Sequence, residues 1–259
     1  MPQVVFIGLG LNDEKGITLE GLEEARHADR VFAEFYTSIM PHLHLSGLEE
    51  TIGKSVEVLT RTQLEDEDGK RILSAVERGK VAFLVPGDPM IATTHVALRL
   101  AVAKRGVSSR IIHGASVVSA VCGVTGLQSY KFGKSTTLPR DGAVPPSVVE
   151  VIKENRARNL HTLILLEFRA GEETQLTIGE AVNKLVQAEN HVGEWLAVGA
   201  SRIGSQDQKV SAAKARTLAG FEFGHVPHLV VFPGKLHFME AEALKVFCGA
   251  TDQDIEAGL

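Results

Sequence analysis

Short apolar runs alternate with longer amphipathic stretches along the first half of the chain. Runs of branched and aromatic residues predict buried strands at 3–7, 30–34, 56–59, 81–85 and 110–113. Between them, apolar positions at helical spacing predict helices at 18–29, 69–78 and 92–104, the first capped by Thr18. Repeated alternation of strand and helix is typical of a parallel sheet covered on both faces. Residues 1–113 are therefore expected to form an N-terminal α/β domain with a mostly parallel sheet.

In the second half of the chain, predicted strands and helices alternate less regularly. Its apolar runs predict strands at 160–168, 195–200 and 227–232, and helices at 116–121, 177–188 and 236–247. The stretch 134–146 is rich in Pro, Gly and Thr and is expected to be a loop, and the acidic tail after Gly249 is expected to fray. Residues 114–259 should form a C-terminal α/β domain with a mixed sheet.

Composition narrows the class of protein. A chain of 259 residues with 44% hydrophobic and 23% charged residues is long enough for two medium α/β domains with buried cores. Its net charge of −5 argues against bulk binding to nucleic acid or to a membrane surface. There is no charged-then-apolar leader and no apolar stretch of membrane-spanning length, so a cytoplasmic protein is expected. The cysteines, Cys122 and Cys248, are flanked by apolar residues and are expected to be buried thiols.

The turn Pro86-Gly87-Asp88-Pro89-Met90 directly follows the buried strand at 81–85. Ligands bind at the carboxyl ends of strands in open α/β sheets, which is where this turn lies. Gly87 allows close approach of the backbone, Asp88 supplies a carboxylate, and the prolines stiffen the loop. Pro-Gly and Asp-Pro are also ordinary turn dipeptides, so the motif alone does not establish a site.

A glycine-rich turn after the first strand suggests a nicotinamide-dinucleotide site, but two features disfavour it. In favour of such a site, Glu34 ends the next strand at the spacing of a ribose-binding acid. Against it, Gly8-x-Gly10 is followed by Asp13 at the position where the dinucleotide-binding motif needs a third glycine. The next helix begins near Thr18, too late for its N-terminus to hold a pyrophosphate.

Other catalytic signatures are weak or absent. Gly133-Lys134-Ser135 lacks the earlier glycine that a P-loop requires. Ser116 does not lie in the Gly-x-Ser-x-Gly motif of a nucleophilic serine, and it is suited to cap a helix. His42 and His44 have no cluster of further ligands, so no metal site is expected. The histidines form no pattern, which leaves general acid–base catalysis open but assigns it to no residue.

Five segments carry a resemblance to a known family. They are GLGLNDEKGIT at 8–18, AEFYTS at 33–38, GDPMIATTH at 87–95, SAVCGVTGLQSYKFGKS at 119–135 and PGKLH at 233–237. Together they resemble the archaeal diphthine synthases, a family with the tetrapyrrole-methylase fold, and the resemblance runs from about residue 5 to residue 243. The first turn reads Gly-Leu-Asn-Asp where the wider fold family usually has Gly-Pro-Gly-Asp, which favours the narrower family over a porphyrin-like substrate.

The resemblance implies two α/β domains with a ligand cleft between them, in which S-adenosylmethionine lies folded. It implies transfer of three methyl groups to the amine of a 3-amino-3-carboxypropyl histidine on translation elongation factor 2, a step in diphthamide biosynthesis. A homodimer is also implied. Since a sulfonium is already a strong methyl donor, such an enzyme needs alignment and exclusion of water more than a catalytic dyad.

Matched residue by residue, the resemblance places eight side chains at the cofactor. They are Leu11, Asp88, Ile91, Ser116, Val117, Leu166, Ile203 and His228. Asp88 would be the polar anchor, and Leu166 and Ile203 would be adenine walls. Several have plain structural interpretations as well: Leu11 suits core packing, and a histidine in an apolar strand, such as His228, is often a core residue with satisfied hydrogen bonds.

The loop around residue 131 offers a candidate docking surface for the elongation factor. Tyr130, Lys131 and Lys134, with Arg140 nearby, could contact an acidic surface, although a basic loop exposed to solvent is an equally good interpretation. The alternative to an enzyme is a non-catalytic module of the same fold that binds S-adenosylmethionine or docks to a protein.

Overall fold

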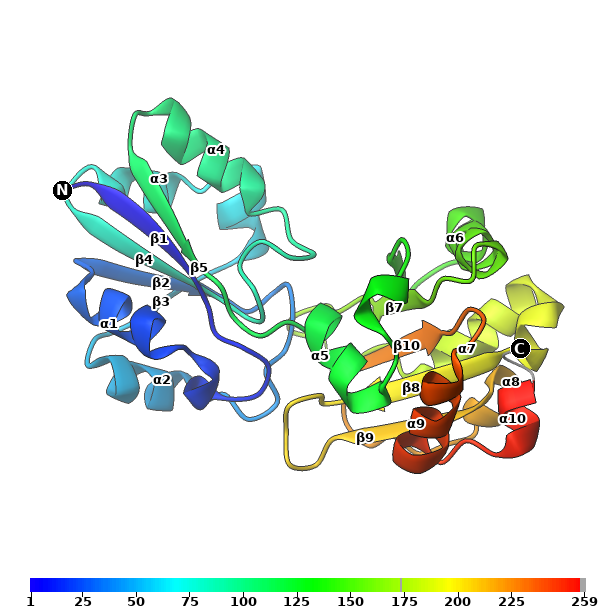
Figure 1. Cartoon of the computed structure of the whole chain (residues 1–259). Helices are drawn as coiled ribbons and strands as arrows, with labels where there is room; N and C mark the ends of the chain where they lie inside the picture. Colours follow the sequence, from blue (N-terminus) through cyan, green and yellow to red (C-terminus); the bar gives the residue numbers. More distant parts are fainter. Residues whose placement is uncertain (173, 257–259) are drawn as a thin grey trace. The chain divides into compact units, whose positions relative to one another are not determined.

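The computed structural model describes residues 1–172 and 174–256, which divide into two compact units, Met1–Val117 and Val118–Leu259. The division falls between Val117 and Val118 rather than between residues 113 and 114. Each unit contains a five-stranded sheet and its own covering helices (Figure 1).

The sheet of unit 1 is entirely parallel, with strand order β3-β2-β4-β1-β5. Its strands are β1 (Gln3–Gly8), β2 (Arg30–Glu34), β3 (Glu57–Leu59), β4 (Lys80–Val85) and β5 (Ser108–Ile112). Its helices are η1 (Glu14–Gly16), α1 (Leu19–His27), α2 (Leu45–Ile52), the π-helical turn η2 (Thr62–Asp66), α3 (Lys70–Val76) and α4 (Val96–Lys104). The strands lie within two residues of their predicted ranges, because nearly continuous apolar runs are what a doubly covered parallel sheet requires.

Helices cover both faces of this sheet. α1 and α2 lie on one face and α3 and α4 on the other (Figure 1). Ala25 and Leu48 pack with Val5 and Ile7 in one core, whereas Ile72 packs with the opposite face in a second. Thr18 caps α1 as predicted, with its hydroxyl accepting from the N–H of Gly21 at 3.0 Å.

The sheet of unit 2 is mixed, with order β6-β7-β10-β8-β9, in which only β6 and β7 run parallel. Its strands are β6 (Thr136–Leu138), β7 (Thr162–Leu166), β8 (Leu196–Ser201), β9 (Lys209–Lys214) and β10 (His228–Phe232). Its helices are α5 (Val117–Thr125), which begins at the boundary, η3 (Ser129–Lys131), α6 (Pro146–Ala157), α7 (Ile178–Ala188), η4 (Asn190–Glu194), α8 (Ala215–Leu218), α9 (Phe238–Cys248) and α10 (Asp252–Glu256).

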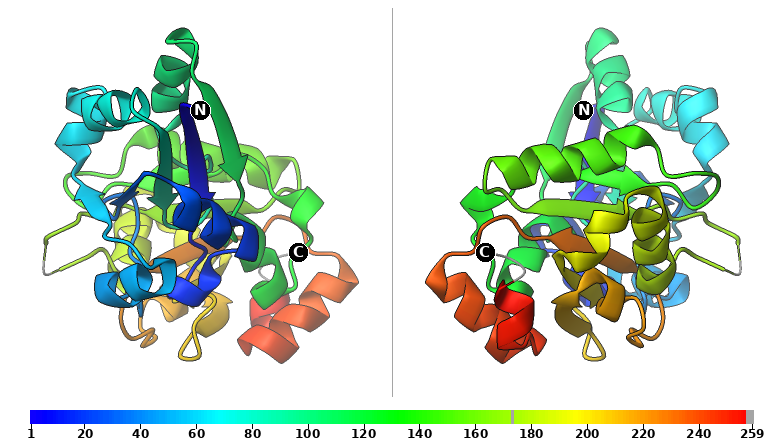
Figure 2. Two further views of the ribbon diagram at one scale, coloured as in Figure 1. Left: turned by 90° about the vertical axis from the view of Figure 1, so that its left-hand side faces the viewer. Right: turned by 90° about the vertical axis from the view of Figure 1, so that its right-hand side faces the viewer.

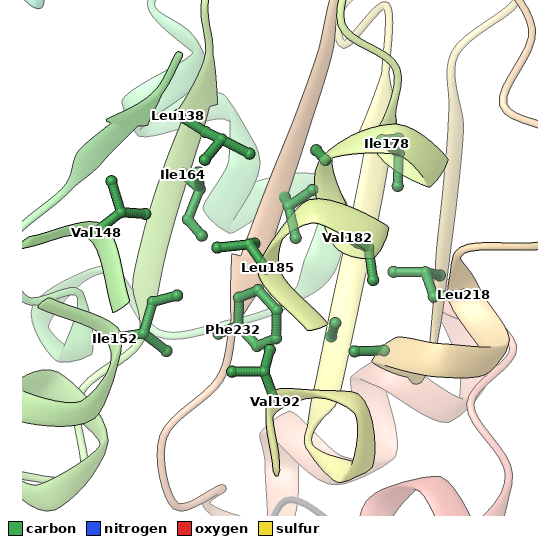
Figure 3. Close-up of a cluster of buried hydrophobic side chains, with 14 of the residues drawn as sticks. Leu138, Val148, Ile152, Ile164, Ile178, Val182, Leu185, Val192, Leu218 and Phe232 are labelled. Carbon is green, nitrogen blue, oxygen red and sulfur yellow. The ribbon is translucent and has the colours of Figure 1, made fainter. Parts of the chain in front are cut away.

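One face of this sheet packs against α6 and α7. Figure 3 shows Ile152 of α6, Leu185 of α7 and Phe232 of β10 pointing toward one another, with Ile164 of β7 beside them. These side chains are almost completely buried, so they form the main apolar core of unit 2.

Two expectations for the second half are corrected, and two elements there were not predicted. The predicted loop at 134–146 contains β6, and helix α6 and strand β9 were not predicted. The tail does not simply fray, because residues 252–256 form α10, which lies beside α9 in both views of Figure 2. Asp254 of α10 accepts from the N–H of Lys214 at 2.9 Å and Ile255 is buried, so tertiary contacts hold this helix. Residues 257–259 lie outside the described part.

No helix within residues 1–172 and 174–256 is long and apolar enough to cross a membrane.

Candidate functional site

Three backbone segments meet at the carboxyl edge of the unit 1 sheet. Leu9 donates to the carbonyl of Val85 at 2.8 Å, and Gly10 and Gly87 form an antiparallel bridge with N···O distances of 3.2 and 2.7 Å. A Cβ atom on Gly8 would lie 2.5 Å from both the N of Gly114 and the O of Gly87. The backbones of the turns after β1, β4 and β5 therefore touch one another, at the edge where parallel sheets bind ligands.

Gly87 has a different reason to be glycine. Its φ of +69° is one that side-chain-bearing residues avoid, whereas a Cβ atom at this position would find its nearest neighbour 3.9 Å away. A Cβ atom would therefore meet only an ordinary van der Waals contact at this position, and the backbone conformation is the reason for glycine. Ala92, five residues on, also adopts a positive φ of +56°, so the loop after β4 is held in an uncommon conformation.

Asp88 is only 4% exposed, and its two carboxylate oxygens accept hydrogen bonds from different groups. Oδ1 accepts from the N–H of Met90 at 2.9 Å, and Oδ2 lies 2.7 Å from Nδ1 of His113. The first contact closes the turn, and the second joins the loop after β4 to the first residue beyond β5. The carboxylate is therefore held by its own unit.

His113 was not singled out by the sequence. Its side chain is 73% exposed even though one ring nitrogen contacts the buried Asp88. The available signal was positional: His113 directly follows β5, and β4 and β5 flank β1 in the sheet, so their ends converge. The apolar runs alone do not give that strand order.

Two buried ionisable side chains, Glu34 and His95, lie in the neighbouring segments of unit 1. Glu34 is fully buried, and its Oε2 accepts from the N–H groups of Tyr36 and Thr37 at 2.9 and 3.0 Å. His95 Nε2 lies 3.8 Å from Glu34 Oε1 and forms no hydrogen bond within the described residues, while Nδ1 lies 3.3 Å from the carbonyl of Pro89. Burial raises the pKa of Glu34 and lowers the pKa of His95 to about 4. His95 is therefore a neutral anchor for the far end of the loop that carries Asp88.

The other predicted cofactor residues of unit 1 lie in the turns that follow its strands or at the start of α5. Leu11 is half-buried in the turn after β1, and Ile91 is 43% exposed in the loop after β4. Ser116 is buried immediately before α5, and Val117 is the first residue of that helix. The turns that carry Leu11 and Ile91 are bridged to each other through Gly10 and Gly87.

The predicted cofactor residues of unit 2 gather around the ends of three strands. Leu166 is half-buried at the end of β7, and Ile203 is buried just beyond β8. Ile203 follows Arg202, whose guanidinium donates to the carbonyls of His225 and Asp207 at 3.0 Å each. The backbone N–H of Arg202 also donates to the carbonyl of Pro227 at 2.9 Å, so Ile203 lies on a firmly held turn.

His228 is buried at the start of β10, and both its ring nitrogens have partners. Nδ1 accepts from the N–H of Ile178 at 3.2 Å, so Nε2 carries the proton and donates to the carbonyl of His225 at 3.1 Å. Burial lowers the pKa of His228 and keeps the ring neutral. The ring of His228 therefore serves the fold of unit 2.

The three candidate docking residues differ in their surroundings. Tyr130 is 77% exposed and Lys134 is exposed as well. Lys131, in contrast, points its ammonium inward, where it pairs with the buried carboxylate of Glu240 and donates to the carbonyl of Lys235 at 2.7 Å. Lys131 is therefore corrected from a solvated rim residue to an internal ion-pair partner.

Glu240 is the centre of that internal network. It accepts from the N–H groups of His237 and Gln128 at 2.8 and 2.9 Å and from Nε2 of His161 at 2.8 Å. Burial alone would raise the pKa of Glu240, but these bonds together with Lys131 outweigh it and hold the pKa at about 2.

The unit 1 edge offers a ligand both apolar surface and backbone hydrogen-bonding groups. Ile91 and Leu11 offer apolar surface, and the touching turns offer backbone groups. Within the described ranges, no group of three or more His, Cys, Asp or Glu side chains is arranged to hold a metal ion.

Known proteins resemble this chain over nearly its whole length. A family model described as "Tetrapyrrole (Corrin/Porphyrin) Methylases" matches residues 3–219. The diphthine synthase of Halorubrum lacusprofundi is 43% identical over 98% of this chain and 99% of the relative, and that of Methanocaldococcus jannaschii is 40% identical over 95% and 98%. A crystal structure of diphthine synthase has a TM-score of 0.91 at 40% identity, covering 98% of this chain and 99% of that one. This chain belongs to the tetrapyrrole (corrin/porphyrin) methylases and, within them, to the diphthine synthase family.

Proposed function

We propose that this protein transfers methyl groups from S-adenosylmethionine to the amine of a 3-amino-3-carboxypropyl histidine on translation elongation factor 2, three in all, during diphthamide biosynthesis. Its family makes it a methyltransferase of that route. The supporting observation is the match to diphthine synthases at 40–43% identity across both units, because a shared fold alone would not restrict the substrate.

We propose that the cofactor contacts the residues expected from the family: Leu11, Asp88, Ile91, Ser116 and Val117 of unit 1, and Leu166, Ile203 and His228 of unit 2. When bound, S-adenosylmethionine supplies an activated methyl group on a cationic sulfur. Asp88 and His228 would act through backbone atoms, since their side chains already have partners within their own units. Ile91 and Leu11 would supply apolar surface and exclude water.

The chain's contribution to the reaction is alignment in a dry site. Holding an amine in line with the methyl group replaces an encounter in solution by a reaction within one complex. Apolar walls suit a cation whose charge disperses in the transition state, whereas an ionic partner would stabilise the ground state more. Among the unit 1 residues proposed to contact the cofactor, Leu11, Ile91 and Val117 have that character.

We propose that the protein acts as a cytoplasmic homodimer and recognises a folded protein partner through Tyr130 and Lys134. Both side chains are exposed, and an exposed cation increases the rate of association with an acidic surface. Lys131 is not part of this proposed surface, because its charge is neutralised by Glu240.

The first test measures both binding and product. Isothermal titration calorimetry with S-adenosylhomocysteine should show binding, and NAD should show none. Incubation with isotopically labelled S-adenosylmethionine and elongation factor 2 bearing the precursor side chain should add the mass of three methyl groups to that side chain. Cofactor binding without any methyl transfer would favour the non-catalytic module instead.

The docking proposal is tested by Lys134→Glu with Lys104→Glu as the matched control. Lys104 is exposed at the end of α4, far along the chain from the proposed surface, and its substitution changes net charge equally. Lys134→Glu should slow methylation through association, leave cofactor affinity unchanged, and lose its effect as salt shortens the Debye length below about 10 Å. Equal rates for the two variants at low salt would rule out the docking role.

A further inference from the structure

The contact between Asp88 and His113 has the geometry of a carboxylate–imidazole pair. The Oδ2–Nδ1 distance is 2.7 Å, and the two side chains differ sharply in burial, since Asp88 is 4% and His113 73% exposed. An ionised carboxylate can only accept, so Nδ1 of His113 must carry the proton in this hydrogen bond. In the neutral ring the lone pair is then on Nε2.

Three turns of unit 1, all within the described residues, meet beside this pair. The turn after β4 brings Asp88 itself, with its other oxygen bound by the N–H of Met90. The turns after β1 and β5 bring Gly8 and Gly114, which contribute backbone only. The ring is thus oriented by one buried carboxylate, at the sheet edge where ligands bind.

The proposed reaction needs a proton acceptor. An amine is protonated at neutral pH and has no lone pair for attack until that proton is removed, and each methyl group added gives an ammonium again. On the basis of the proposed function, we propose that Nε2 of His113 accepts the proton of the target ammonium, and that Asp88 is the positioning residue that fixes the ring for this transfer.

The step consists of a proton transfer followed by the methyl transfer. The N–H bond of the ammonium breaks, its electron pair stays on nitrogen, and the proton forms an N–H bond with Nε2 of His113. The freed pair then forms the N–C bond to the methyl group, while the C–S pair leaves with sulfur as a neutral thioether. The imidazolium is stabilised by the Asp88 carboxylate and returns its proton to solvent through the exposed side of the ring.

His113→Ala is the direct test, with His27→Gln as the matched control. His27 is exposed at the last residue of α1, which starts at the site edge and runs away from it. General-base catalysis is worth about 10²- to 10⁴-fold, so His113→Ala should lower kcat by about 100-fold or more, while His27→Gln changes it less than about twofold. Calorimetry with S-adenosylhomocysteine should give the same Kd for all three proteins.

Added imidazole separates proton transfer from structure. Because the position is exposed, free imidazole should enter the space left in His113→Ala and restore kcat in a concentration-dependent way. A kcat equal to that of the wild type in His113→Ala overturns the proposal. So does a fall in kcat that imidazole does not restore while S-adenosylhomocysteine still binds.

Asp88→Asn tests the positioning role by a readout that does not depend on turnover. Long-range ¹H–¹⁵N spectra of the wild type should show His113 as the tautomer with the proton on Nδ1, and Asp88→Asn should shift it toward a mixture. An unchanged tautomer, or a wild-type ring protonated on Nε2, refutes the role of Asp88. A wild type with the expected tautomer but no methyl transfer would instead refute the proposed function, which keeps the two failures distinct.

Discussion

Replacing Glu240 by glutamine should destabilise unit 2 selectively. The carboxylate is fully buried and accepts from two backbone N–H groups, the ring of His161 and the ammonium of Lys131. Gly234 donates to Nδ1 of His161 at 3.0 Å, so Nε2 is the nitrogen that donates to Glu240. Glutamine keeps the volume but removes the charge and turns an N–H₂ group toward these donors, leaving Lys131 without its anion.

The magnitude follows from the pKa of Glu240. A folded value of about 2 against a usual 4.5 corresponds to about 3 kcal/mol of stability at pH 7. Because the folded pKa is the lower one, the unfolded chain binds a proton first as pH falls. The contribution is therefore complete above about pH 4.5 and is lost between there and about pH 2, and the gap between wild type and variant should shrink by about 2 kcal/mol on going from pH 7 to pH 3.

The single tryptophan makes this measurable within one unit. Trp195 lies against Phe232 at 6.5 Å between ring centroids, so its fluorescence reports the core of unit 2. With a urea m-value of about 2 kcal/mol/M, Glu240→Gln should lower the midpoint by about 1.5 M at pH 7. Glu242→Gln, on an exposed position of the same helix, is the control. A shift no larger than the control's, or one equally large at pH 7 and pH 3, would contradict this account of the network.

Three further outcomes are expected. Gly114→Ala should unfold or severely destabilise unit 1, because its Cβ would collide with the carbonyl of Gly87. The helical Gly123→Ala has free space and should raise stability by about 0.5–1 kcal/mol, and melting temperatures of the two variants test both expectations. Burial raises the pKa of Cys248 to about 12, so timed alkylation followed by mass spectrometry should modify the half-buried Cys122 first and Cys248 only on unfolding. Thr177→Ala should cost about 1 kcal/mol in denaturant unfolding, because it removes the capping box of α7.

How far the sequence predicts the fold depends on where each element's stability comes from. The strand at 81–85 is a continuous apolar run and was predicted correctly, because a strand buried on both faces needs that composition. β9 was missed because Lys209–Lys214 contains lysine, serine and alanine, which have low strand propensity, and its pairing with β8 decides its conformation. α10 was missed for a different reason: Thr251 and Asp254 form a reciprocal cap at its start, a local signal that was overlooked, and the tertiary contacts of Asp254 and Ile255 add to it.

In the candidate site, too, residues marked by local signals were predicted and residues placed by tertiary contacts were not. The Gly-Asp-Pro turn could be located from the sequence, because the strand before it and the glycine within it are local signals. The partner of Asp88 could not, since His113 is 25 residues away and meets it only through the strand order of the sheet. The inward orientation of Lys131 was equally hidden, because Glu240 lies 109 residues further along the chain.

Because the backbones of Gly8, Gly87 and Gly114 touch, substitutions at this edge have different consequences inside and outside that contact. A side chain at Gly8 or Gly114 would displace two other turns at once. A single substitution at either position therefore disrupts the packing of all three turns. Side chains such as Leu11 and Ile91 lie on those turns but outside the contact, and they can change without moving it. Libraries that vary these outer positions and keep the three glycines fixed should therefore yield folded proteins, which makes this edge a practical starting point for testing the proposed cofactor contacts.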